Sequence, residues 1–339
     1  MFIEKPNIYS QSAVNLQVQI FKVLDLFSGM GGFSYGFAHE GFQTTGVDIK
    51  EEAGLSYQHL NKGKFILSDL HNELIGDRDY DVIIGGPPCR PWSSVNTIKR
   101  GENHPDYTLV RKFLEHIRYL KPRLFIMENV PPLAKDSILS ELISSTKDMG
   151  YSVDKIKVTY SNFGASVKRT RLIISGILES DVSSFLRSLN FETIKAGTVR
   201  DSISDLQDKD YGSLPDHIWP NLTTIRSYEK YYKSGKYGWR ILKWNEPAPS
   251  FGNVMKTYTL HPNSSFEKGY FRTISIAEAA RIMGFPQSFA FPGKIPMGKR
   301  YQMIVDSVSP IFSSVMAKIT NNFLKGEFDY VSDENRYIS

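Results

Sequence analysis

Between residues 22 and 177 the sequence alternates short β-type runs with helical patterns, and this rhythm constrains the fold more than any other feature. Strands separated by helices are typical of a parallel sheet whose faces are covered by helices. Helical spacing is clearest over residues 107–120. We predict an α/β fold with a doubly wound, mostly parallel sheet. The expected strands are KVLDLF (22–27), QTTGVD (43–48), KFIL (64–67), YDVII (80–84), RLFIM (123–127), KIKVTY (155–160) and RLIISGI (171–177).

The rhythm ends after about residue 178. Residues 197–270 carry scattered Pro, Gly, Tyr and Trp without a sustained period, which favours a second, smaller and irregular domain. A length of 339 residues is sufficient for two domains. We assign residues 1–180 and 300–339 to one domain and residues 181–299 to the other.

The only cysteine, Cys89, lies in GGPPCRPWSS (85–94). One thiol can form neither an internal disulfide nor a multi-cysteine zinc site, and we expect no metal centre. Cys89 follows the carboxyl end of the strand expected at residues 81–86, and ligands of open α/β sheets bind at that edge. Burial is the common fate of a cysteine, but the flanking prolines and the polar loop that follows favour a nucleophile.

A glycine-rich turn follows the first strand in VLDLFSGMGGFSYGF (23–37). Such a turn before a helix presents backbone N–H groups and lets a ligand approach closely. Asp48 ends the next strand, where a carboxylate meets ribose hydroxyls in nucleoside-binding units, and Asp69 ends the third. The dinucleotide pattern requires glycine at position 34, where this chain has Ser34, so the turn alone leaves the cofactor open.

Two further motifs belong to the same edge. Glu128 follows the fifth strand in RLFIMENVPP (123–132), although a carboxylate there can also be solvated or cap a helix. Arg169 and Arg171 alternate along the strand expected in VKRTRLIISG (167–176), so we expect both on one face. Paired guanidiniums suit an anionic or carbonyl-bearing ligand, while a surface basic face is the ordinary alternative.

A cysteine, an acid and paired arginines fit one reaction. A thiolate that adds to carbon 6 of cytosine turns carbon 5 into the nucleophilic end of an enamine. The addition is easier when an acid protonates or hydrogen-bonds nitrogen 3. Arginines can hold the carbonyl oxygen of the ring and stabilise the developing charge.

The motifs occur in a fixed order: DLFSGMGGF (25–33), PPCRPWS (87–93), MENV (127–130), FGASVKRTR (163–171), RTISIAEAARIMGFP (272–286) and YQMIVDSVSP (301–310). With them the chain resembles the DNA (cytosine-5)-methyltransferases of the prokaryotic restriction–modification type, over about residues 22–320. The resemblance implies a Rossmann-like methyltransferase fold, S-adenosylmethionine as cofactor and a cytosine flipped out of duplex DNA as substrate. The second domain is then a target-recognition domain, and a cognate restriction endonuclease is an implied partner.

By the same resemblance, Cys89 attacks the cytosine, Glu128 engages nitrogen 3, and Arg171 with Arg169 contacts the base. Phe27 stacks on the cofactor, Asp48 contacts its ribose, Asp69 its adenine, and Leu109 lines its pocket. The other implied cofactor residues are Gly29, Met30, Gly31, Gly32, Ile49, Leu70, Pro88, Asp306 and Val308.

Three positions depart from the family pattern. Arg90 stands where the family usually has glutamine after the cysteine, and Val167 replaces the glutamine that begins the arginine motif. Asp306 replaces asparagine in the final motif. Since Cys89 and Glu128 are intact, we expect an active enzyme.

Two regions are predicted to contact DNA. The polar segment 90–108 is a candidate loop that closes over the flipped base. In TIRSYEKYYKSGKYGWRILKW (224–244) basic residues are interleaved with Tyr and Trp, which favours phosphate and base contacts over a merely solvated face. The predicted contacts are Arg90, Ser93, Lys99, Arg100, Arg226, Lys230, Lys233 and Arg240.

Composition agrees with an intracellular DNA-binding protein. A net charge of +5 and a pI near 9.0 mildly favour a polyanionic partner. The N-terminal stretch lacks the apolar core of a secretory signal, and we expect no apolar run long enough to span a bilayer. We expect a monomer in the cytoplasm, associated with the nucleoid.

Three alternatives compete with this interpretation. A same-fold enzyme acting on tRNA cytosine would carry a Cys–Phe–Thr signature in the insert, and this chain has no second cysteine. An inactive cofactor-binding regulator would not need Cys89 and Glu128. Amino-methylation of adenine or cytosine needs an Asp/Asn-Pro-Pro-aromatic motif, which the sequence lacks.

Overall fold

The computed structural model describes residues 19–77, 79–93, 100–191, 194–222, 224–236 and 238–327. Its centre is a seven-stranded sheet with the order β3-β2-β1-β4-β5-β8-β6. All neighbours are parallel except β8, which runs antiparallel to both β5 and β6. The strands are β1 (Lys22–Leu26), β2 (Gln43–Asp48), β3 (Lys64–Leu67), β4 (Val82–Gly85), β5 (Leu124–Asn129), β6 (Tyr151–Thr159) and β8 (Thr170–Leu178).

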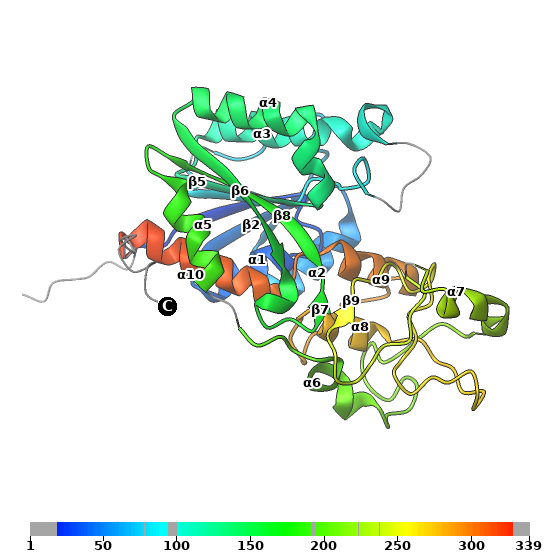
Figure 1. Cartoon of the computed structure of the whole chain (residues 1–339). Helices are drawn as coiled ribbons and strands as arrows, with labels where there is room; N and C mark the ends of the chain where they lie inside the picture. Colours follow the sequence, from blue (N-terminus) through cyan, green and yellow to red (C-terminus); the bar gives the residue numbers. More distant parts are fainter. Residues whose placement is uncertain are drawn as a thin grey trace, which may run out of the picture.

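Helices cover both faces of this sheet, as predicted (Figure 1). On one face lie α1 (Gly32–His39), α2 (Glu51–Asn61), α5 (Val182–Phe191) and α10 (Pro310–Lys325). On the other lie α3 (Leu109–Leu120) and α4 (Ser137–Asp148). The buried apolar residues form two clusters, one on each side of the sheet. The central strands read as continuous apolar runs because both of their faces are buried.

Among its described residues, the irregular part of the chain holds mostly short elements. They include α6 (Val199–Ile203), α7 (Glu229–Lys233), β9 (Ala248–Pro249), α8 (Ile276–Ile282) and α9 (Met297–Asp306). The two-stranded pairing of β9 with β7 (Val167–Lys168) attaches this part to the segment that precedes β8. In Figure 1 these elements lie together beside the sheet.

Two details differ from the sequence predictions. Helix α3 begins at Leu109, because residues Pro105–Thr108 form a 3-10 turn before it. Arg169 does not lie on one strand with Arg171, since the chain bends between β7 and β8 with a bond from Arg169 N–H to the Val167 carbonyl. In addition, α5 packs on β6, β8 and α10, although the proposed domain assignment placed it in the second domain.

Residues Met297–Lys325 are long and apolar enough, by composition, to cross a membrane, contrary to the expectation that no such run exists. The stretch consists of two helices, α9 and α10, which are interrupted at residues 307–309. In the most apolar window, 67% is buried inside the protein. The stretch is therefore accounted for as part of the protein core.

Candidate active site

The sheet order creates a switch point between β1 and β4. The chain leaves β1 toward β2 on one side and returns to β4 on the other, and ligands of open α/β sheets bind at such a crevice. Leu26 and Gly85 are register partners, so the glycine-rich turn and the Pro–Pro–Cys turn start side by side. A side chain at Gly85 would collide with the Leu26 carbonyl, which explains the glycine there.

Two hydrogen bonds to backbone carbonyls of the Pro–Pro–Cys turn hold it in place. The Asn129 side-chain amide donates to the Pro87 carbonyl (3.0 Å), and Trp92 N–H donates to the Cys89 carbonyl (3.0 Å). The Cys89 side chain is half-buried. Burial raises the pKa of the Cys89 thiol, while Arg171 and Arg169 lower it and Glu128 and Asp306 raise it. The structure thus brings the predicted nucleophile, acid and arginines together.

Glu128 is nine-tenths buried at the end of β5. Its Oε1 lies 2.8 Å from Arg171 Nε and accepts a hydrogen bond of 3.1 Å from the Tyr160 hydroxyl. Because β8 is antiparallel, its first residues lie at the same edge as the carboxyl ends of β4 and β5. This explains how Arg171, at the start of a strand, reaches an acid at the end of another.

Arg169 is 6% exposed, and its Nε has no hydrogen-bond partner among the described residues. Burial, followed by the neighbouring charge of Arg171, lowers the pKa of the Arg169 guanidinium. A buried N–H without a partner is rare in proteins. It fits a site whose acceptor is supplied by a ligand.

The glycine-rich turn is tied to β2. Gly29 N–H donates to Asp48 Oδ2 (2.9 Å), and Lys50 N–H donates to Asp48 Oδ1 (3.0 Å). Burial raises the pKa of the Asp48 carboxyl, against these hydrogen bonds. Phe27 and Gly29 both have positive φ, and a Cβ at Gly29 would meet open space. The turn therefore leaves room for a ligand beside the Asp48 carboxylate.

Asp69 lies just beyond β3. Its carboxylate accepts from the backbone N–H of His71 (3.0 Å) and the side chain of Asn72 (3.0 Å). The His71 backbone bond lowers the pKa of Asp69. Phe27 supplies an aromatic ring, and Asp48 and Asp69 supply carboxylates at the ends of adjacent strands. Such a set of groups suits a nucleoside.

The remaining predicted cofactor residues differ in burial and position. Gly31 and Gly32 begin α1, and a side chain at Gly32 would overlap Ser307 Oγ, so the segment before Val308 packs directly on the turn. Ile49 is 60% exposed and Asp306 is exposed at the end of α9. Pro88 is half-buried, whereas the side chains of Met30, Leu70, Leu109 and Val308 are buried.

The segment after Cys89 is anchored where it is described. The Trp92 indole donates to Asp136 Oδ2 (2.8 Å), the Tyr107 hydroxyl donates to Asp136 Oδ1 (2.6 Å), and Gly101 N–H donates to the Pro91 carbonyl (2.9 Å). Arg90 and Arg100 are exposed at the two ends and Ser93 is half-buried. Lys99, also predicted to contact DNA, lies outside the described residues.

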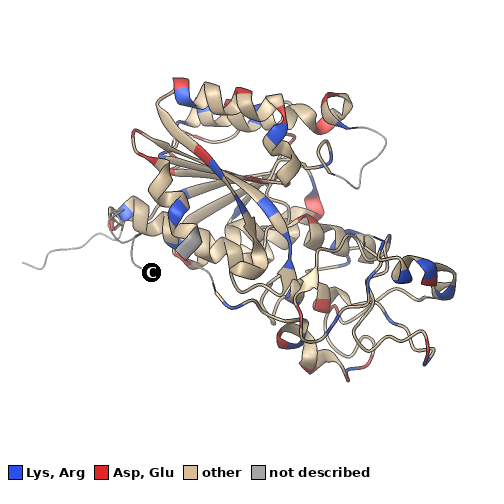
Figure 2. Cartoon of the chain, viewed as in Figure 1, with Lys and Arg blue, Asp and Glu red and all other residues tan. Residues whose placement is uncertain are grey.

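In the basic stretch of the second domain, aromatic rings pack against one another and against a lysine. Tyr228 stacks on Trp239 with ring centroids 4.6 Å apart, and Lys236 lies 4.1 Å above the Tyr231 ring. Lys and Arg are prominent along α7 in Figure 2. Arg226, Lys230 and Lys233 are exposed, and Lys233 pairs with Glu229 at 2.7 Å. Arg240 instead donates to the backbone carbonyls of Lys236 and Trp239.

Sequence reasoning missed one residue of the site and gave no role to another. Asn129 was expected beside Glu128 at the carboxyl edge of the fifth strand, and the structure shows that its side-chain amide donates to the Pro87 carbonyl. Tyr160 belongs to no predicted site, yet its hydroxyl meets Glu128. The signal for Tyr160 was its place at the end of a strand whose alternate residues are apolar, but its reach toward Glu128 depends on the sheet order.

The sheet order and the covering helices define an α/β fold of the Rossmann-like methyltransferase type. The model of one family, C-5 cytosine-specific DNA methylase, matches residues 21–322, and the chain belongs to this family. It is a DNA (cytosine-5)-methyltransferase. This confirms the resemblance and the fold class predicted from the motifs.

Relatives of similar length support the assignment. The chain is 26% identical to Type II methyltransferase M.FnuDI of Fusobacterium nucleatum, over 88% of this chain and 93% of that one. It is 29% identical to Type II methyltransferase M.HindV of Haemophilus influenzae, over 90% and 97%. Among solved structures, S. pombe Dnmt2 methyltransferase has a TM-score of 0.69 at 16% identity, over 89% and 99%, which shows the shared fold.

Proposed function

We propose that the enzyme methylates carbon 5 of a cytosine flipped out of a short specific DNA site, through a covalent bond from Cys89 to carbon 6. The observation that carries this proposal is the convergence of Cys89, Glu128 and Arg171 at one sheet edge. A base in a duplex is inaccessible to a half-buried thiol, so the base must leave the stack.

The residues divide the work of the addition step. The Cys89 thiolate forms the bond to carbon 6 while Glu128 gives a proton to nitrogen 3, and the ring becomes an enamine. Arg171 stabilises the resulting Glu128 carboxylate, and the unpaired Arg169 Nε is available to the base carbonyl. Since burial raises the pKa of Cys89, the two guanidiniums are needed to favour its thiolate.

The cofactor residues are Phe27, Asp48 and Asp69, with the turn from Gly29 to Gly32 and the segment at Val308. S-adenosylmethionine, when bound, supplies the methyl group as an electrophile. Transfer of the carbon-5 proton to water, departure of the Cys89 sulfur as thiolate and return of the nitrogen-3 proton to the Glu128 carboxylate then restore the aromatic ring. Open space beside Gly29 and the carboxylates at the ends of β2 and β3 support this placement.

The irregular part acts as the target-recognition domain. Arg226, Lys230 and Lys233 would bind phosphates, together with Arg90 and Arg100 beside Cys89. We place the domain boundary after α5 rather than at residue 180, because α5 packs on the sheet. Phosphate binding predicts that affinity for DNA falls steeply with salt, and an affinity unchanged between about 50 and 200 mM salt would contradict it.

The biological setting follows from the relatives. Their names contain "type II methyltransferase", which supports a role beside a restriction endonuclease that cuts the same site. The protein would act as a monomer in the cytoplasm, at the nucleoid. Bisulfite sequencing of DNA from cells that express it would reveal the target sequence.

The mechanism is tested by covalent trapping. Duplex DNA with 5-fluorocytosine at the target position cannot lose its carbon-5 substituent, so the wild-type protein with S-adenosylmethionine should form an adduct stable to denaturation. Cys89→Ser should form none while it still binds the cofactor, because the serine hydroxyl is a far weaker nucleophile. An adduct in Cys89→Ser would refute the mechanism, and trapping of a tRNA in place of DNA would favour the RNA alternative.

A further inference from the structure

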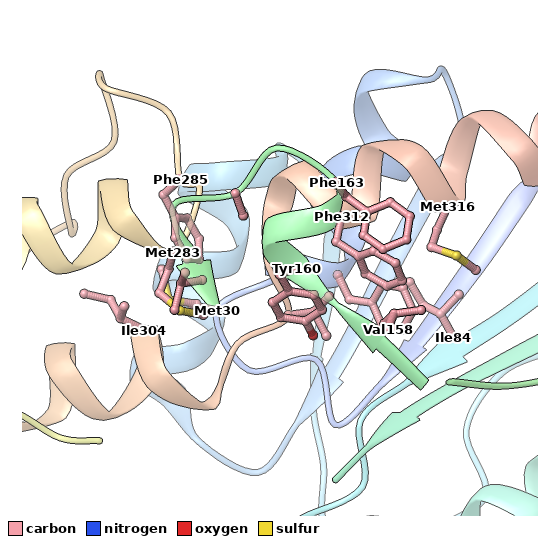
Figure 3. Packing of buried hydrophobic residues seen from close by; sticks show 14 of the residues in the cluster. Met30, Ile84, Val158, Tyr160, Phe163, Met283, Phe285, Ile304, Phe312 and Met316 are labelled. Atoms are coloured by element: carbon pink, nitrogen blue, oxygen red, sulfur yellow. The ribbon is translucent and has the colours of Figure 1, made fainter. Parts of the chain in front are cut away.

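Tyr160 is a buried phenol next to the acid of the site. It follows β6 as the first residue of the 3-10 turn Tyr160–Asn162, and its side chain is fully buried. Its ring stacks on Phe312 of α10, with centroids 5.2 Å apart and an interplanar angle of 25°. Figure 3 shows the ring beside Val158, Phe163 and Phe312. The packing leaves the side chain little freedom to turn.

The hydroxyl of Tyr160 acts as a donor. Burial raises the pKa of Tyr160 well above its ordinary value, so the phenol keeps its proton. It donates a hydrogen bond to Glu128 Oε1 at 3.1 Å. A buried tyrosine hydroxyl generally requires a partner, and here the partner is the proposed general acid.

Both neighbours of Glu128 use the same oxygen. Arg171 Nε lies 2.8 Å from Oε1, which Tyr160 also contacts. The second oxygen, Oε2, lies beside Gly86, at the start of the turn that carries Cys89. A Cβ placed on Gly86 would be 3.5 Å from this oxygen. An oxygen that already accepts from a guanidinium and a phenol is the less basic of the two.

We infer that Tyr160 is a positioning residue for the methylation reaction: it fixes Glu128 Oε1 so that Oε2 is the oxygen that exchanges a proton with the cytosine. This inference rests on the proposed function. In the addition step the proton passes from Oε2 to nitrogen 3 as the sulfur–carbon bond forms. The carboxylate left behind is stabilised at Oε1 by Tyr160 and Arg171, with Arg169, Cys89 and Asp306 as the other ionisable groups that share the site.

The test is Tyr160→Phe, which keeps the ring stack on Phe312 and removes only the hydroxyl. We expect kcat to fall about 10- to 100-fold, part of the effect of a general acid, with unchanged KM for DNA and for S-adenosylmethionine. A purely structural role would change the melting temperature without this separation of kcat from KM.

Tyr151→Phe is the matched control. Tyr151 is a buried tyrosine at the opposite end of β6, and its hydroxyl donates to the Pro122 carbonyl at 2.7 Å. It loses the same group away from the site, so its kcat should stay at the wild-type level. If Tyr160→Phe behaves like Tyr151→Phe in kcat, the inference is wrong.

A double-mutant cycle tests whether the loss in Tyr160→Phe passes through Glu128. If Tyr160 acts through Glu128, then Tyr160→Phe should have no further effect on the methylation rate in the Glu128→Gln background. Independent, multiplicative losses would overturn the inference. Failure of the wild-type protein itself to trap 5-fluorocytosine DNA would instead reject the proposed function, so the two failures are distinguishable.

Discussion

Two buried Arg–Glu pairs, one in each part of the molecule, are built differently. In the active site Glu128 meets both Arg171 and Tyr160 through Oε1. In the irregular domain Glu278 uses both oxygens on Arg272, at 2.8 Å each, and Oε2 also accepts from the backbone N–H of Ser275. The Glu278 side chain is fully buried, while that of Glu128 is 10% exposed.

The difference teaches how a buried charge is used. Glu278 closes a capping box with Ser275 at the start of α8, and Arg272 lies over the Trp219 ring, so this pair joins separate segments of a domain with little regular structure. Glu128 keeps one oxygen directed toward the Cys89 turn. We therefore expect Glu278 to serve folding and Glu128 to serve chemistry.

The largest effect is expected from Glu128→Gln. Methyl transfer should slow by about 10²- to 10⁴-fold, since the amide cannot donate a proton as an acid does. The melting temperature should change less than in Glu278→Gln, because the side chains of Arg171 and Glu128 are 11% and 10% exposed whereas those of Arg272 and Glu278 are 5% and 0% exposed. Methylation rates and thermal unfolding of the same preparation test this, and a stable variant with near wild-type turnover would break the contrast.

Glu278→Gln should have the opposite effects, with a large loss of stability and little loss of methylation rate. Removing one charge from a buried pair leaves Arg272 uncompensated, and we expect the free energy of unfolding to fall by about 3–5 kcal/mol. Denaturant titration measures this change. The control is Asp205→Asn, which breaks the more exposed pair with Arg281 and should cost at most about 1 kcal/mol. Equal losses in the two variants would contradict the assigned role of Glu278.

Asp25 on β1 is a third buried carboxyl, and its hydrogen-bond partner is a serine rather than an arginine. It is 1% exposed, and its Oδ2 accepts from the Ser34 hydroxyl at 2.7 Å. Burial raises the pKa of Asp25 to about 7. Between about pH 4 and pH 7 the folded protein thus binds a proton that the unfolded chain releases, and stability falls as pH rises.

Asp25→Asn has no such titration. Its stability relative to the wild type should increase from pH 4 to pH 7, by at most about 4 kcal/mol. Urea unfolding at several pH values measures the difference. Asp154→Asn, at an exposed position of β6, serves as the control and should leave the pH dependence unchanged. A constant difference between Asp25→Asn and wild type would show that Asp25 ionises as in the unfolded chain.

Much of the catalytic part was predictable because local patterns determine it. Strand positions follow from apolar runs, and the carboxyl ends of parallel strands meet at one edge, so Cys89 and Asp48 could be placed in advance. The antiparallel direction of β8 was not evident from its composition. That direction is what brings Arg171 to Glu128.

Other features depend on tertiary contacts that a sequence does not reveal. Tyr160 reads as an ordinary apolar strand residue until α10 covers its ring and β8 separates β6 from β5. Arg240 reads as a DNA contact, yet the structure directs its guanidinium to the backbone carbonyls of Lys236 and Trp239. A basic residue in a predicted interface can therefore be committed to the fold.

The packing of α10 on α1 has a consequence for biosynthesis. Gly36 N–H donates to Ser313 Oγ at 3.0 Å, and that hydroxyl in turn donates to the Phe33 carbonyl, so residues about 280 positions apart interlock. Contacts of such separation form late as a chain leaves the ribosome. Nascent or prematurely terminated chains that lack α10 should consequently leave the genome unmodified.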